Sequence, residues 1–147
     1  MTIHTTSFSH LDNETLYDML QLRSEVFVVE QNCVYQDLDG IDKKAMHSWI
    51  AEDGKMVACA RFFMKNERKK VAQIGRIVVA KNQRRKRYAS YLMRSVMDNA
   101  KRMLGAKHFY LEAQTYAIPF YERLGFKVCS EEFLEDGIPH VKMESDV

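Results

Sequence analysis

The chain has 147 residues, with 22 Lys and Arg against 20 Asp and Glu, and a formal net charge of +2. A chain of this length fits one domain and buries about 68 to 70% of the surface that its unfolded form exposes. No window approaches the roughly 20 apolar residues of a membrane span, and the first residues lack the basic and apolar regions of a signal peptide. The cysteines, Cys33, Cys59 and Cys129, have no CxxC spacing. We therefore expect one cytoplasmic domain over residues 1–147, with no membrane partner.

The first half of the chain predicts one helix and three strands. Residues 2–8 suit a short strand, and Asp12 or Asn13 can cap the helix that follows. Residues 46–64 predict two strands joined by an Asp-Gly turn, because Asp-Gly between apolar runs is a strong hairpin signal.

The second half predicts alternating strands and helices. Residues 72–80 form a mostly apolar strand, and apolar residues then recur from Ala89 to Leu104 with the spacing of an amphipathic helix. Further elements follow in the order strand, short helix, strand and strand, over residues 108–114, 117–126, 127–134 and 140–145, with a turn at 135–139. This order predicts an α/β or α+β domain.

Four consecutive basic residues, Arg84 to Arg87, lie where the long helix begins, at the partly positive end of its dipole. They could form a solvated charge run, a stripe that binds nucleic acid, or half of a site for a ligand with several negative charges. Residues 81–87 hold five of the 22 basic residues, which leaves 17 basic against 20 acidic residues elsewhere. So local a charge disfavours nucleic acid, because duplex-binding proteins spread cations over a long face.

Two segments resemble the GNAT-fold N-acetyltransferases. Residues 84–89 are similar to the acetyl-CoA signature [QR]-x-x-G-x-[GA], except that Arg87 replaces the central Gly. Residues 114–126, QTYAIPFYERLGF, resemble the later N-x-x-A-x-x-[FL]-Y-x-x-x-G-F element, with Gln114 at the Asn position. The segments 23–40 and 135–143 look like the ElaA-like branch of small bacterial GNAT proteins.

The resemblance implies a GNAT fold, in which helices flank a mixed, mostly antiparallel sheet with a V-shaped splay. It also implies acetyl-CoA as co-substrate, and transfer of its acetyl group to a primary amine of a small molecule or peptide. Gly75, within a strand pattern, would mark a bulge that opens this splay. The residues expected to hold acetyl-CoA are Ile77, Val78, Val79, Arg84, Arg85, Lys86, Arg87, Tyr88, Ala89, Ser90 and Gln114.

Three residues are candidates for proton transfer. The resemblance assigns Tyr121 as the acid that protonates the departing thiolate, while an aromatic core residue is the structural alternative. His140 follows a Gly-Ile-Pro turn expected on the surface, and is the candidate base unless it merely bonds a backbone carbonyl. Glu112 is the alternative base, on one face of its strand with Tyr110 and Gln114, or a solvated carboxylate.

The acceptor pocket has weaker candidates. An acidic run after the first helix could attract a cationic amine, although a solvated loop is the simpler interpretation; it includes Glu30, Tyr35, Asp37, Asp39 and Asp42. Arg23 and His47 could line the same pocket or serve packing. No pair of His or Cys residues has metal-ligand spacing, so we expect no metal. A nucleic-acid-binding module and a non-catalytic CoA sensor remain alternatives, and a homodimer stays open.

Overall fold

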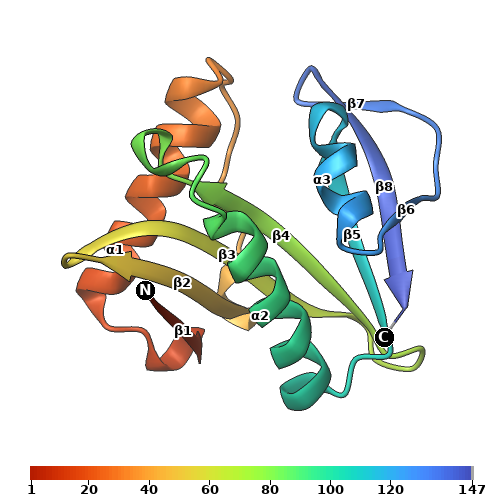
Figure 1. Cartoon of the computed structure of the whole chain (residues 1–147), viewed down its shortest axis with the longest axis horizontal. Coiled ribbons are helices and arrows are strands. Elements are labelled where there is room, and N and C mark those ends of the chain that lie inside the picture. The colour runs from red at the N-terminus through yellow and green to blue at the C-terminus, as the bar shows by residue number, and fades with distance from the viewer. Residues whose placement is uncertain (147) are drawn as a thin grey trace.

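The structure is a computed structural model that describes residues 1–146. Its main elements are a sheet, two long helices and several short helical turns (Figure 1). The strands are β1 (Thr2–Ser7), β2 (Met46–Glu52), β3 (Lys55–Asn66), β4 (Val71–Val79), β5 (His108–Gln114), β6 (Lys127–Val128), β7 (Phe133–Glu135) and β8 (Ile138–Asp146). The helical elements are η1 (Phe8–His10), α1 (Asn13–Arg23), η2 (Ser24–Glu30), η3 (Ile41–Lys44), η4 (Lys81–Gln83), α2 (Tyr88–Leu104), η5 (Thr115–Ala117) and α3 (Ile118–Arg123).

The sheet consists of two halves that meet at one end. Strands β1 to β4 form an antiparallel half, and β5 to β8 form a second antiparallel half. The halves join through a parallel pairing of β4 with β5 that covers only Val71–Gln73 and His108–Tyr110. Beyond that pairing the strands diverge, so that β4 and β5 form the arms of a V (Figure 1). The predicted mixed, mostly antiparallel sheet with a splay is confirmed.

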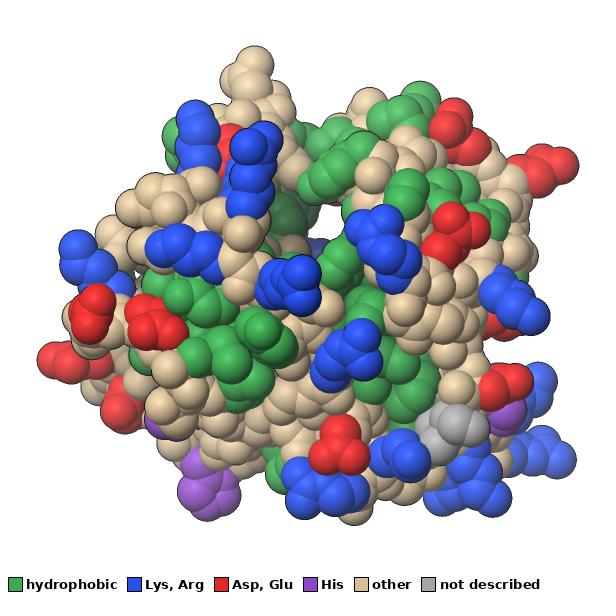
Figure 2. Space-filling view, in the orientation of Figure 1, with side chains coloured by type: hydrophobic (Ala, Val, Ile, Leu, Met, Phe, Trp, Pro, Cys, Tyr) green, Lys and Arg blue, Asp and Glu red, His purple; other side chains and the backbone are tan. Residues whose placement is uncertain are grey.

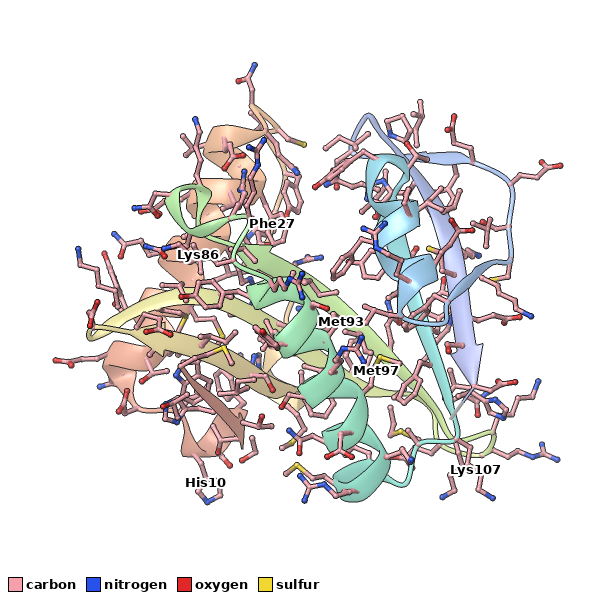
Figure 3. The ribbon with its side chains drawn as sticks, in the orientation of Figure 1. His10, Phe27, Lys86, Met93, Met97 and Lys107 are labelled. Carbon is pink, nitrogen blue, oxygen red and sulfur yellow. The ribbon has the colours of Figure 1, made fainter. Side chains whose placement is uncertain are left out.

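Two helices cover opposite faces of the half of the sheet that β1 to β4 form. The apolar stripe of α2 packs on β2, β3 and β4, and it buries Leu92, Met93 and Val96 completely. Each such side chain contributes about 1.5 to 3 kcal/mol relative to an exposed position. Figure 3 labels Met93 and the partly buried Met97 on this helix. Helix α1 packs on the other face, around the smaller core that contains Met19.

Local signals in the sequence account for most element ends. The Asp12 carboxylate accepts a hydrogen bond from the Thr15 amide at 2.7 Å and caps α1 as predicted. Asp53 and Gly54 both have positive φ, which is the backbone of the predicted hairpin turn. Gly105 ends α2 with a φ of 70°. No helix within residues 1–146 is long and apolar enough to cross a membrane.

Two predicted elements differ from the structure. The strand expected over residues 127–134 forms only at its two ends, as β6 and β7. Between them the Ser130 side chain, rather than a backbone carbonyl, accepts the hydrogen bond of the Lys142 amide at 2.8 Å, which interrupts the ladder. The turn expected over residues 135–139 is shorter, because β7 extends to Glu135 and β8 begins at Ile138. His140 lies in the predicted strand, but it was expected at the surface and only 8% of it is exposed.

Candidate active site

A cleft of about 1290 Å³ lies between the two arms of the V. One wall is formed by β4, η2 and the start of α2, and the other by β5, α3 and the β7–β8 hairpin. The space-filling view shows an opening at this place, with Lys and Arg side chains around it (Figure 2). A cleft of this size can hold a ligand much larger than a single amino acid.

The β4 wall has a bulge and a free edge. The register passes from Val78 opposite Cys59 to Gly75 opposite Arg61, so two residues of β4 oppose one residue of β3. The bulge therefore lies at Arg76, whose φ is 49°. The prediction had placed it at Gly75, one residue earlier. Past Gln73, within residues 1–146, no strand pairs with the β4 edge that faces β5. The predicted segment Ile77–Val79 consequently lines the cleft with its free edge, apart from the Val79 carbonyl, which accepts a hydrogen bond from Arg84.

The start of α2 presents unpaired amides to the same cleft. The Tyr91 amide makes the first intrahelical bond, to the Arg87 carbonyl at 3.0 Å, so the amides of Tyr88, Ala89 and Ser90 precede the helical ladder. These three residues line the cleft. Arg87 takes a φ of 63°, the left-handed backbone that Gly adopts without strain. Arg87, which stands at the position of the motif Gly, thus has a backbone conformation that Gly could also adopt.

Arg84 is held in place by an ion pair. Its guanidinium donates two hydrogen bonds to the Glu30 carboxylate, at 2.6 and 2.8 Å, and a third to the Val79 carbonyl at 3.2 Å. The hydrogen bonds from Arg84 lower the pKa of Glu30 below its usual value, although partial burial opposes them. Glu30 therefore anchors the basic loop to η2, and its charge is already compensated.

Part of the acidic run is buried, contrary to the simpler prediction of a solvated loop. Asp37 and Asp42 are 5% and 7% exposed. Together with Asp39 they pair with three arginines from three other elements. The ion pairs, all between 2.7 and 3.3 Å, are Arg23–Asp37, Arg23–Asp42, Arg61–Asp39, Arg61–Asp42, Arg76–Asp37 and Arg76–Asp39. The hydrogen bonds of Arg61 hold the pKa of Asp39 far below its usual range. These carboxylates fix the segment to the sheet instead of facing an acceptor.

Two predicted acceptor residues lie outside the cleft. Arg23 is 1% exposed inside the ion-pair network, and His47 is fully buried with Nε2 bonded to the Asp42 carbonyl at 2.8 Å. Burial lowers the pKa of His47, which keeps it neutral. Both residues serve the packing of the acidic segment. Tyr35 does line the cleft, and its hydroxyl donates to Asp37 at 2.9 Å.

Tyr121 and Gln114 lie on the opposite wall. The Tyr121 ring packs against Phe120 and Phe126 at centroid distances of 5.0 and 6.1 Å, and the residue also lines the cleft. Burial raises the pKa of the Tyr121 hydroxyl, so it remains protonated at neutral pH. Gln114 accepts a hydrogen bond from Gln31 at 3.3 Å, which ties the two walls together. Both predicted residues are thus at the cleft.

His140 and Glu112 share one face of the C-terminal half of the sheet. In the β5–β8 ladder Gln114 lies opposite His140, and Glu112 lies opposite Lys142. The His140 ring stacks on Phe133 at 6.0 Å, and its Nδ1 lies 2.7 Å from the Ile138 carbonyl oxygen. Its Nε2 is 3.5 Å from the carboxylate of Glu135. His140, Glu112 and Glu135 all line the cleft.

Residues 10–147 match the protein family described as an acetyltransferase (GNAT) domain. The chain belongs to the GNAT family. UPF0039 protein C11D3.02c of Schizosaccharomyces pombe is 42% identical over 142 residues, which cover 95% of this chain and 93% of the relative. ElaA of Escherichia coli is 37% identical over 141 residues, which cover 95% of this chain and 92% of ElaA.

Solved structures agree with this assignment. The crystal structure of Escherichia coli ElaA has a TM-score of 0.92 at 34% identity, and that of an acyl-CoA N-acyltransferase from Pseudomonas aeruginosa has 0.91 at 34% identity. Each comparison covers 99% of both chains. The predicted GNAT fold and ElaA-like resemblance are confirmed, and this chain is an acyltransferase.

In this GNAT chain, sequence reasoning missed two charged residues of the cleft. Arg76 was treated as part of an apolar strand. Its bulge depends on ion pairs with Asp37 and Asp39, which the linear sequence does not place beside it. Glu135 was assigned only to a turn. The hairpin register could have revealed it, because a two-residue turn at Asp136 and Gly137 puts Glu135 opposite Ile138, beside His140. Across residues 1–146, no group of His, Cys, Asp and Glu is arranged to hold a metal ion.

Proposed function

We propose that this chain is an acetyl-CoA-dependent N-acetyltransferase that transfers an acetyl group to a primary amine by direct attack of the amine on the thioester. The observation that carries the proposal is the β4 edge at Ile77–Val79, which pairs with no strand of residues 1–146 on its cleft side. A short loop joins this edge to the amides of Tyr88–Ser90, which precede the helical ladder of α2. The β4 edge offers peptide-like hydrogen bonds, and the N-terminus of α2 offers an anion-binding site.

These two features suit the two chemical parts of acetyl-CoA. The pantetheine arm contains amides, which can pair with the β4 edge as an added strand would. The pyrophosphate carries negative charge, which suits the amides of Tyr88, Ala89 and Ser90 and the cations at Arg85 and Arg87. When bound, acetyl-CoA would supply an acetyl group activated as a thioester.

The residues of the two walls then have separate tasks. His140 Nε2 takes a proton from the attacking amine, since its Nδ1 is committed to the Ile138 carbonyl. A backbone N–H of the β4 edge stabilises the negative charge that develops on the carbonyl oxygen. As the C–N bond forms and the C–S bond breaks, the Tyr121 hydroxyl gives a proton to the departing sulfur.

Thermal unfolding with and without acetyl-CoA tests the binding step. A ligand at 100 times its Kd stabilises the native state by about 2.7 kcal/mol, which raises the Tm of a chain of this size by roughly 5 to 10 °C. Ala89→Glu should abolish the rise without unfolding the protein, because a carboxylate suits a free helix N-terminus but repels a pyrophosphate. Lys101→Glu, at an exposed position farther along α2, is the matched control. An unchanged Tm for the parent at millimolar acetyl-CoA would refute the proposal.

A further inference from the structure

The acceptor side of the cleft is rich in carboxylates. Arg61 and Arg76 line it, but together with Arg23 their charges are matched by Asp37, Asp39 and Asp42. Three further carboxylates line the cleft, and none of them forms an ion pair with a Lys or Arg of residues 1–146; they are Glu112, Glu135 and Asp136. Burial and the charge of Glu112 raise the pKa of Glu135, although the neighbouring His140 and Arg76 oppose this.

An independent feature lies among these carboxylates. More than nine-tenths of His140 is buried, and its Nδ1 is bonded to a carbonyl oxygen, which can only accept. Nδ1 therefore carries a hydrogen, and in the neutral ring Nε2 presents a lone pair. Within residues 1–146, no hydrogen-bond donor reaches Nε2. Its polar neighbour is the Glu135 carboxylate at 3.5 Å, which is a second acceptor.

Two acceptors at this separation suit one group that donates to both. An ammonium group has several N–H donors and a positive charge, so it can donate to Nε2 and to the carboxylate together. The same contact prepares the reaction, because the proton that must leave the amine already points at Nε2. Glu112 and Asp136 then provide more negative charge than one ammonium group neutralises.

We infer that the acceptor is a primary amine with a second positive charge, and that its reacting ammonium group binds between Glu135 and His140. The inference rests on the proposed function, which leaves the acceptor unspecified. Glu135 is thereby a specificity-determining residue, and the acidic residues expected to attract the acceptor, Glu30, Asp37, Asp39 and Asp42, are replaced in that role by Glu112, Glu135 and Asp136.

Three probes that differ mainly in their second group test the charge requirement. Putrescine has a second ammonium, aminobutanol a neutral hydroxyl and γ-aminobutyrate a carboxylate. We expect kcat/KM for acetyl-CoA-dependent acetylation to be at least about tenfold higher for putrescine than for aminobutanol, and lowest for γ-aminobutyrate, with the preference reduced by salt. Glu135→Gln should lower the preference for putrescine about tenfold, because it removes the charge and keeps the size. Glu131→Gln, at an exposed position outside the cleft, should leave it unchanged.

Calorimetric binding of putrescine to the CoA complex keeps the test independent of turnover. We expect putrescine to bind to the parent and to Glu131→Gln, and to bind more weakly to Glu135→Gln. Equal kcat/KM for the three amines, a preference for γ-aminobutyrate, or no putrescine binding to the parent would each overturn the inference. A failed proposed function would look different, since acetyl-CoA would then neither stabilise the protein nor release its thiol with any amine.

Discussion

The Nδ1 atom of His140 lies 2.7 Å from the carbonyl oxygen of Ile138, and this contact determines which ring nitrogen can act as a base. His140→Ala should lower kcat/KM at neutral pH by about 10²- to 10⁴-fold, because a positioned general base is lost. The rate should recover partly at high pH, where more of the amine is already neutral. A pH profile from about 5.5 to 9.5 measures both effects.

Glu112 is the alternative general base, and it would give the opposite pH profiles. If Glu112 were the base, the acidic limb of the profile would survive in His140→Ala and disappear in Glu112→Gln. We expect the reverse, since the His140 Nε2 is within 3.5 Å of Glu135 on the acceptor side. An acetyl-CoA-induced Tm rise in both variants confirms that their folds and cofactor sites are intact.

Tyr121→Phe should separate catalysis from packing. The variant keeps the ring that contacts Phe120 and Phe126, so stability should change little. Loss of the hydroxyl removes the proposed proton donor, and kcat should fall about 10²- to 10⁴-fold with acetyl-CoA affinity nearly unchanged. Undiminished kcat would instead assign Tyr121 to the core alone.

Arg87→Gly tests the left-handed turn before α2. A non-glycine residue in this conformation lowers the free energy of unfolding by about 1 to 2 kcal/mol. Gly avoids this strain, but the greater conformational entropy of its unfolded state costs about 0.5 to 1 kcal/mol. We therefore expect a gain of roughly 0.5 to 1 kcal/mol in unfolding free energy, measured by urea denaturation. Acetyl-CoA affinity should fall no more than a few-fold, because the backbone amides keep their places. Arg87→Ala, which keeps the Cβ, controls for loss of the side chain and should show no gain.

The ion-pair network predicts how stability depends on pH. Arg61 depresses the native pKa of Asp39 below its ordinary value of 3.8. Well above that ordinary value the carboxyl is ionised in both states and its full contribution to stability is present. As pH falls below it, the unfolded chain binds a proton that the native state does not, so stability declines until the native pKa is reached.

Asp39→Asn should therefore lose stability at pH 6 and show a weaker decline toward pH 2.5 than the parent, by thermal unfolding. Asp18→Asn, on an exposed face of α1, should follow the parent curve. Parallel curves for the parent and Asp39→Asn would contradict the assigned role of this pair.

The elements with strong local signals were predictable from sequence, and the network was not. Asp12, the Asp53–Gly54 turn and the apolar stripe of α2 act over a few residues, so their patterns identify them directly. The partners of the acidic run come from α1, β3 and β4, and only tertiary structure brings them together. The bulge at Arg76 and the interrupted ladder at Ser130 likewise depend on partners far along the chain.

The candidate site divides in the same way. The cofactor side follows one continuous segment, from β4 into α2, and its motif resemblance located Ile77–Val79 and Tyr88–Ser90 at the cleft. The acceptor side combines β5, β7 and β8, and there the sequence identified Glu112 and His140 but overlooked Glu135. Arg23 and His47 were plausible by residue type, yet burial removes both from the cleft.

The most direct test of acetyl-CoA-dependent N-acetylation compares two products in one reaction. Purified protein, acetyl-CoA and a primary amine are incubated, free CoA thiol is titrated, and acetylated amine is quantified by mass spectrometry. We expect both products to accumulate in equal amounts, at a rate that depends on Tyr121 and His140. Thiol release without acetylated amine, or no release with any amine while the protein remains folded, would contradict it.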